Sequence, residues 1–208
     1  MTAEPTVTED DPPGRPAAGP SVRSRSQHQR RRRIVQAAAA LASRGGIEAM
    51  QMRTVAERAG VALGTLYRYF PSKMDLVVAV VAEELDLLEA SIERRPPRAA
   101  TRPQRVVDVL MRATRGLIRE PELADALIRS LLLSDIKIEF GDRTTNLLLR
   151  AAYGPEEPIP AGDERRVVTK ALTSIWAMEM IEILRGHSTL DETQVRLEVS
   201  ASRLLSDG

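Results

Sequence analysis

The 208-residue chain contains no cysteine, and this absence removes several kinds of chemistry at once. Without a thiol there is no disulfide, no thiolate zinc site and no cysteine nucleophile. Only two histidines occur, and neither a Gly-x-Ser-x-Gly motif nor a phosphate-binding glycine loop is present. The adjacent acids Glu83-Glu84 and Glu156-Glu157 favour solvated roles over acid/base catalysis. We therefore expect no enzymatic activity, no bound metal and no cofactor.

Long apolar runs are also missing. The longest, Leu76 to Ala82, is far shorter than the ~20 residues that a bilayer-spanning helix needs. The acidic, proline-containing beginning of the chain does not resemble an export signal. Together with the lack of cysteine, these features predict a cytoplasmic protein without a membrane partner.

Acidic residues are absent from one segment, although the formal net charge of the whole chain is only +1. Between Val22 and Ile47 there is no acid, and the arginines there are Arg23, Arg25, Arg30, Arg31, Arg32, Arg33 and Arg44. Such a local excess indicates an anionic partner. Residues 1–26 contain almost no large apolar side chain to offset the entropy of ordering, so we predict a disordered tail there.

The rest of the chain has helical periodicity throughout, without the alternation typical of strands. Apolar stripes and turn residues predict helices at 29–44, 52–58, 62–69, 72–93, 103–119, 121–133, 138–153, 163–185 and 190–205. We therefore expect an all-α fold of about nine helices. Apolar residues surround most of the helix at 163–185, which should be buried on more than one side.

Local signals sharpen several of these boundaries. Gly45-Gly46 predicts the end of the first helix, and Pro71 should force Phe70 out of helical geometry. Ser72 offers an N-cap for the next helix, with Asp75 three residues later.

The two short helices at 52–58 and 62–69 have the features of a helix-turn-helix. Ala56 is small where the backbones would cross, and Gly60 tolerates the positive φ of the turn. An ordinary helical hairpin would share these features. The exposed side of the second helix favours DNA, because its small N-terminal residues allow close approach to bases while Tyr67, Arg68 and Tyr69 supply polar groups.

The arginines give an independent argument. Arg30 to Arg33 would lie in the first turn of the helix at 29–44, where each positive charge opposes the macrodipole at about 0.3–1 kcal/mol. A polyanion near that helix start would reverse the effect, and Arg23 and Arg25 on a flexible arm could reach a neighbouring groove. The alternative is a solubilising basic tail.

The run from Met52 to Lys73 closely resembles the DNA-binding domain of the TetR family of bacterial repressors. The resemblance implies that DNA is faced by Arg53, Ala62, Leu63, Gly64, Thr65, Tyr67, Arg68, Tyr69 and Lys73. Gln51 departs from the family, which usually places threonine there to cap the helix and touch a phosphate, because glutamine is a poorer cap. We add Gln51, Arg23, Arg25, Arg30 and Arg31 to the predicted DNA-binding set.

Within this family, the segments 49–53 and 67–70, with Trp176, are similar to the KstR-type repressors of lipid and sterol catabolism in actinobacteria. The family resemblance implies a homodimer built from the last two helices, and the apolar circumference of the helix at 163–185 supports it separately. A twofold dimer predicts recognition helices about 34–36 Å apart and a palindromic operator.

A small-molecule effector would lie among the helices between residues 103 and 185. Candidate lining residues are Met111, Leu127, Leu131, Leu132, Phe140, Leu148, Trp176 and Met180. Each of these residues could instead belong to the core. Because few charges fall within the apolar stripes, we expect an apolar, lipid-like or acyl-CoA-like effector. Its phosphate could be held by Arg112, Arg115, Arg129 or Lys137, unless these form a solvated face.

The sequence thus predicts a ligand-responsive repressor that binds double-stranded operator DNA as a dimer and is released by its effector. The DNA-binding domain would span residues 27–71, and the effector-binding and dimerisation domain residues 72–208. The alternative is a non-specific nucleic-acid packaging protein that depends on the arginines alone.

Overall fold

The computed structural model describes residues 22–133, 137–154 and 159–206, and these form α-helices without any strand. The helices are α1 (Val22–Ala49), α2 (Met52–Ala59), α3 (Leu63–Tyr69), α4 (Lys73–Arg94), α5 (Arg102–Leu117), α6 (Pro121–Leu133), α7 (Lys137–Tyr153), α8 (Glu164–Leu184) and α9 (Leu190–Leu205). The prediction of an all-α fold is confirmed. Apart from α1, each helix begins and ends within two residues of its expected bounds.

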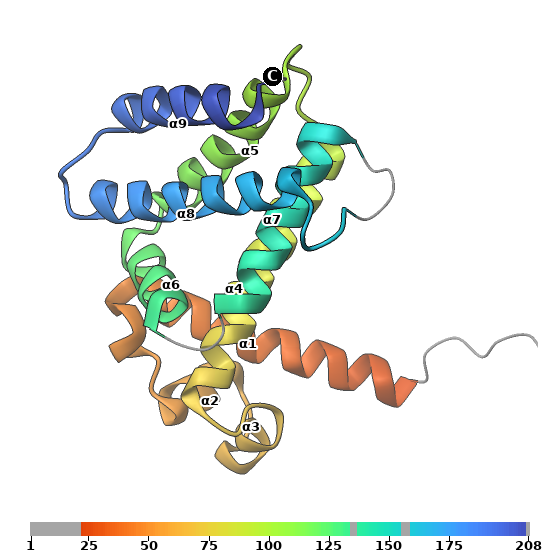
Figure 1. Cartoon of the computed structure of the whole chain (residues 1–208). Coiled ribbons are helices and arrows are strands. Elements are labelled where there is room, and N and C mark those ends of the chain that lie inside the picture. Colours follow the sequence, from red (N-terminus) through yellow and green to blue (C-terminus); the bar gives the residue numbers. More distant parts are fainter. Residues whose placement is uncertain (1–21, 134–136, 155–158, 207–208) are drawn as a thin grey trace, which may run out of the picture.

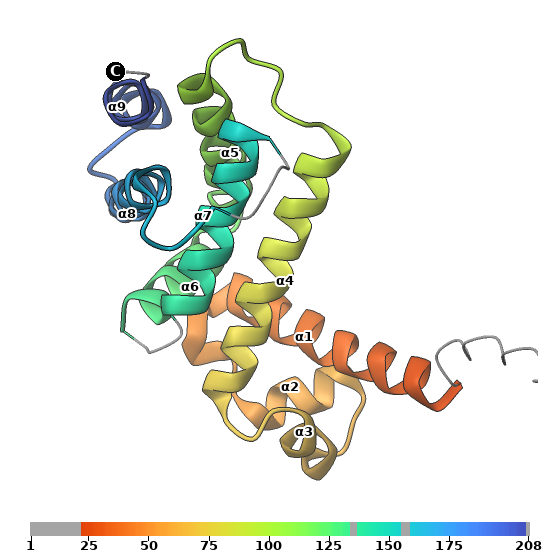
Figure 2. The same cartoon turned by 45° about the vertical axis from the view of Figure 1, so that its right-hand side comes forward.

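The first three helices form one end of the molecule, and α4 runs from them toward the opposite end (Figure 1). Helices α5, α6 and α7 pack against α4, and α8 and α9 lie side by side beyond α5 and α7, on the outer face (Figure 2). Helix α6 turns back toward the first end and packs against α1. No helix in the described ranges is long and apolar enough to cross a membrane.

Helix α1 differs from the prediction at its start. It begins at Val22, so the last five residues of the expected tail are helical. Arg30 to Arg33 therefore lie about two turns beyond the helix start, where the macrodipole argument does not apply. The extension was missed because arginine and glutamine favour helices through backbone propensity, which a search for apolar stripes does not detect.

The other end of α1 follows the expected glycine signal. Gly45 and Gly46 leave helical geometry, Gly46 with a φ of 62°, and one further turn reaches Ala49. A side chain at Gly46 would be strained by this left-handed backbone.

Buried apolar side chains form two clusters. The first joins α1, α2 and α3 to the beginning of α4, and it also takes in Leu123 and Leu127 of α6. The second draws on the end of α4 and on α5 to α9, with Leu110, Leu148, Leu172 and Met180 among its fully buried members. The first cluster therefore extends past residue 71, where the sequence suggested a domain boundary.

Helix α4 starts at a capping box, as the sequence predicted. The Ser72 hydroxyl accepts a hydrogen bond from the Asp75 amide at 3.1 Å, and the Asp75 carboxylate accepts one from the Ser72 amide at 2.9 Å. Two amides that the helix itself cannot satisfy are thereby paired. Because Ser72 directly follows the turn after α3, this box fixes where α4 leaves the first three helices.

We expect Ser72→Ala to lower the free energy of unfolding by about 1 kcal/mol, since it removes one half of the box. Urea unfolding followed by circular dichroism would measure the loss. Ser202→Ala, at an exposed position inside α9, is the matched control and should leave stability nearly unchanged. Equal stabilities for the two variants would contradict the assigned role of Ser72.

Candidate nucleic-acid interface and effector cavity

The angle between α2 and α3 is set by a tight turn at Gly60. Gly60 adopts a left-handed conformation, with φ 64° and ψ 42°, and the Val61 amide donates to the Ala56 carbonyl at 3.0 Å. Ala56 and Leu66 are buried where the two helices meet. Phe70 then takes an extended conformation ahead of Pro71 and is buried beneath α3. These contacts hold α3 on the outside of the first three helices.

The predicted DNA-facing residues divide into two groups by exposure. The exposed ones are Gln51, Arg53, Ala62, Gly64, Tyr67 and Arg68, and the half-buried ones are Leu63, Thr65, Tyr69 and Lys73. Tyr67 keeps 46% of its surface exposed, an unusual degree for a large ring. Leu63 and Tyr69 pack partly against the first cluster, so they also have a structural role.

Gln51 occupies the N-cap position of α2 without capping it. Its backbone is extended, with φ −72° and ψ 132°, but its side chain accepts no hydrogen bond from the first turn. This observation agrees with the expectation that glutamine caps poorly. The exposed amide of Gln51 is left beside the unpaired amides at the start of α2.

The arginines of α1 occupy different surroundings. The Arg31 guanidinium lies 5.3 Å from the centre of the Phe70 ring, next to the end of α3. The Nε of Arg32 lies 3.7 Å from a carboxylate oxygen of Glu83 on α4. Arg32 also lines a surface groove of α1, together with Arg30, Arg33 and other polar residues. The predicted flexible arm is wrong for Arg23 and Arg25, because both belong to α1.

A second candidate site is a cavity of about 530 Å³ that is open to solvent on one side and lined by α4, α5, α6, α7 and α8. Leu127 and Trp176, both expected to line an effector pocket, do line this cavity. Met111, Leu148 and Met180 are buried in the second cluster and are not among the residues that line the cavity. The side chains of Leu131, Leu132 and Phe140, like those of Arg129 and Lys137, lie outside the described residues.

Sequence reasoning missed the contribution of α4 to this cavity. Val81, Leu85 and Leu88 form one wall, together with Glu84. Their spacing predicts an apolar stripe on α4. A stripe alone does not show whether these side chains pack in the core or line a cavity. The indole N–H of Trp176 on the opposite wall donates to the Thr114 hydroxyl at 2.9 Å, which fixes the orientation of the ring.

Cationic side chains also line the cavity. Arg112 pairs with Asp108 at 2.5 Å and donates to the Arg95 carbonyl, and Lys170 lies 3.5 Å from Asp142. Arg115 donates to the Gln194 side chain at 3.4 Å. Arg119 is exposed and makes no hydrogen bond or ion pair within the part of the chain that the structure describes. The cavity thus combines an apolar interior with several positive charges.

Glu84 is the acidic residue of the cavity wall. Burial raises the pKa of its carboxyl above the ordinary value of 4.5, and repulsion from Glu120 and Glu83 adds to the rise. Among the described residues, Glu84 has no hydrogen-bond donor and no ion-pair partner. An ionised carboxylate held in this way is less well solvated than in the unfolded chain.

The raised pKa of Glu84 implies that the stability of the protein depends on pH. At a pH above this pKa, the folded protein holds a poorly solvated charge, which lowers its free energy of unfolding. As the pH falls, the Glu84 carboxylate binds a proton and this loss of stability becomes smaller. Glu84→Gln should therefore stabilise the protein at about pH 7.5, and the gain should diminish toward about pH 4.5. Urea unfolding at both pH values would measure it, with Glu93→Gln, exposed on the same helix, as the control. A gain that grows as the pH falls would contradict the assignment.

Comparisons with known proteins agree with this arrangement of helices. The family model described as "Bacterial regulatory proteins, tetR family" matches residues 34–80, which include α2, α3 and the start of α4. The HTH-type transcriptional repressor KstR of Rhodococcus jostii (strain RHA1) is 35% identical over 189 residues, covering 89% of this chain and 87% of the relative.

Two solved structures share the fold along nearly the whole chain. A TetR transcriptional regulator from Rhodococcus sp. RHA1 has a TM-score of 0.71 at 32% identity, over 88% of this chain and 98% of that one. FadR from Bacillus subtilis, solved in complex with stearoyl-CoA, has a TM-score of 0.60 at 18% identity, over 84% of this chain and 97% of that one. This chain therefore belongs to the TetR family of bacterial regulatory proteins, which bind DNA to control transcription, and within that family it is similar to KstR.

Proposed function

We propose that the protein is a repressor that binds a palindromic operator as a homodimer and is released by a lipid-like or acyl-CoA-like effector. The observation that carries this proposal is the connection between the two candidate sites. Helices α4 and α6 both line the cavity, and both also pack against α1 beside α2 and α3. A molecule that enters the cavity would therefore act on the helices that hold α3.

Residues 27–71 would form the DNA-binding domain, with α3 in the major groove. The exposed, small residues Ala62 and Gly64 allow the start of α3 to approach base edges, and Thr65 and Tyr67 would read them. Lys73, at the first position of α4, would bind a phosphate beside the free amides of that helix start. Arg53 and the arginines of α1 would add sequence-independent contacts.

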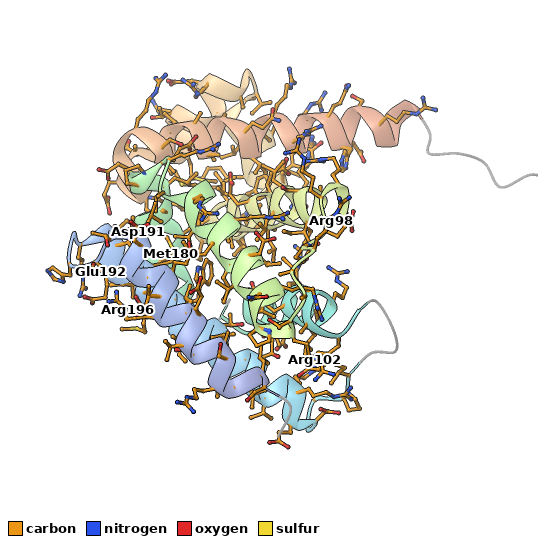
Figure 3. The ribbon with its side chains drawn as sticks, turned by 90° about the horizontal axis from the view of Figure 1, so that it is seen from above. Arg98, Arg102, Met180, Asp191, Glu192 and Arg196 are labelled. Carbon is orange, nitrogen blue, oxygen red and sulfur yellow. The ribbon has the colours of Figure 1, made fainter. Side chains whose placement is uncertain are left out.

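The dimer interface would lie on α8 and α9, within the proposed effector-binding and dimerisation domain of residues 72–208. Val167 and Met178 on α8, and Val195 and Val199 on α9, are each 56–59% exposed. Arg196 of α9 and Glu179 of α8 are joined at 2.7 Å, so the two helices present one surface. Figure 3 shows Arg196 on the first half of α9. Apolar side chains exposed on one pair of helices favour a second copy as partner.

The effector class is supported by the cavity and by one fold relative. Its volume of about 530 Å³ suits a lipid-sized molecule, and its interior is formed by leucine, isoleucine, valine and tryptophan side chains. Arg119 and Arg115 could bind a phosphate of an acyl-CoA outside the apolar interior. The stearoyl-CoA bound to FadR supports the same class.

A route from cavity to DNA follows from the contacts of α1. The Ser43 hydroxyl of α1 donates to the Glu120 carboxylate, just before α6, and Arg32 of α1 pairs with Glu83 of α4. An effector that separates α4 from α6 would shift both contacts and change the spacing of the two α3 helices in the dimer. Coupling of this kind amounts to about 1–3 kcal/mol, or about 5–150-fold in operator affinity.

Selection of DNA from a random pool by the purified full-length protein would test the proposed function. We expect a single palindromic consensus with half-sites about one helical turn apart, bound by a dimer. A packaging protein that uses arginines alone would yield no consensus. An asymmetric half-site bound by a monomer would contradict the dimer.

Release would be measured on the selected operator at fixed salt. Stearoyl-CoA should weaken binding by at least about fivefold, and free CoA, which lacks the acyl chain, should have little effect. If neither acyl-CoA nor other lipid-like molecules changed operator affinity, the proposed effector response would be wrong.

Two substitutions should separate base reading from phosphate binding. Thr65→Ala should reduce discrimination between the operator and a changed base pair by about 1–3 kcal/mol. Lys73→Gln should instead weaken binding to all sequences equally and reduce the slope of log affinity against log salt by about 1. Fluorescence anisotropy at several salt concentrations measures both. Arg94→Gln, at the far end of α4, is the control and should change neither quantity.

A further inference from the structure

Glu84 places a carboxylate in the wall of a mostly apolar cavity. Its neighbours on the same helix face are Val81, Leu85 and Leu88, and Leu127 and Ile128 of α6 line the same space. Glu84 is half-buried in this wall, and an ionised group without a partner there loses part of its solvation. A hydrogen-bond donor placed in the cavity would restore the solvation that the carboxylate has lost.

No described side chain serves as that donor. Glu83 and Glu120, the carboxylates whose repulsion acts on Glu84, are engaged with Arg32 and Ser43 of α1 respectively. The cations that line the cavity are Arg112, Arg115, Arg119 and Lys170, and in the described structure none of them lies within ion-pair distance of Glu84. A hydrogen-bond donor to Glu84 would therefore have to come from a molecule inside the cavity.

We propose that Glu84 is a specificity-determining residue, which accepts a hydrogen bond from a neutral hydroxyl on the apolar body of the effector. The inference rests on the proposed function in one respect, that this cavity is the effector site. It adds a chemical requirement that an apolar wall alone would not impose.

The charges around Glu84 limit which chemical group of the effector could bind there. A carboxylate would face three acidic side chains, Glu83, Glu84 and Glu120, and like charges at short range are strongly disfavoured. An ammonium would have to pass the cations that line the cavity and lose its own hydration. A hydroxyl donates to a carboxylate in a charge-assisted bond and carries little solvation penalty. An anionic group elsewhere on the same effector would lie toward the arginines.

Trp176 provides a direct readout of binding. It is the only tryptophan of the chain, it lines the cavity, and only 5% of its surface is exposed. Its emission therefore reports occupancy of this site without a label and without DNA.

The test is a titration of the full-length protein with 1-decanol, decanoate and decylammonium at about pH 8, where carboxylates are ionised. These probes share one chain and differ in the terminal group. We expect 1-decanol to bind about tenfold or more tightly than decanoate, which corresponds to one charge-assisted hydrogen bond. Decylammonium should bind more weakly than 1-decanol. Tighter binding of decylammonium would overturn the choice of a neutral donor.

Variants at position 84 assign the preference to this side chain. Glu84→Leu should bind 1-decanol and decanoate with similar affinity, because it removes both the acceptor and the repulsion. Glu84→Gln should lose only part of the affinity for 1-decanol, since its amide oxygen still accepts but without the charge, and should bind decanoate more tightly than the native protein does. Glu93→Gln should behave as the native protein. An unchanged preference in Glu84→Leu, or no emission change with any probe, would overturn the proposal.

Operator binding by the same samples separates this inference from the proposed function. Suppose that the protein binds 1-decanol no more tightly than decanoate, but still binds its palindromic operator and is released from it by stearoyl-CoA. Only the role of Glu84 would then be wrong. If the protein selects no operator at all, the proposed function is wrong, whatever the titrations show.

Discussion

Helix α4 buries a single apolar stripe in two different places, and the rest of the architecture depends on this shared burial. Leu76, Val77 and Val80 belong to the cluster of the first three helices, and Ile92 belongs to the cluster of α5 to α9. Between them, Leu85 and Glu84 face the cavity. Because an α-helix is stiff over this length, the two ends of α4 cannot move independently. Whatever shifts its middle must also change the packing at one end.

The same constraint explains why a ligand-sized space can exist in so small a protein. The α4 stripe is held by close packing at both ends, so its centre need not be filled by protein atoms. The capping box at Ser72 and the ion pair between Arg32 and Glu83 fix α4 against the first helices. Arg143 of α7 lies 2.6 Å from Asp86 and 3.0 Å from Glu89, which fixes the other half. The part of α4 that lines the cavity, from Val81 to Ser91, lies alongside both the Glu83 and the Arg143 contacts.

Sequence reasoning succeeded where the physical cause is local. Gly60, Pro71 and the Ser72–Asp75 pair act within a few residues, so the turn, the end of α3 and the start of α4 could be predicted. The cavity depends on side chains from five helices, so Met180 was not separable from Trp176 by sequence alone. The sequence predicted a solvated role for Glu84, because the helices that partly bury it lie far from it in the chain. The early start of α1 was missed because it has few apolar residues.

The continuous helix α1 also changes what its arginine run means. Successive residues of an α-helix point about 100° apart, so four arginines in a row are spread around most of the circumference. In the structure Arg31 lies over Phe70, whereas Arg30, Arg32 and Arg33 line one surface groove, from which Arg32 also reaches Glu83. The run of four arginines is thus divided between one groove and the end of α3. The groove on α1 therefore holds most of the positive charge of this run, and Arg31 alone is turned toward the end of α3.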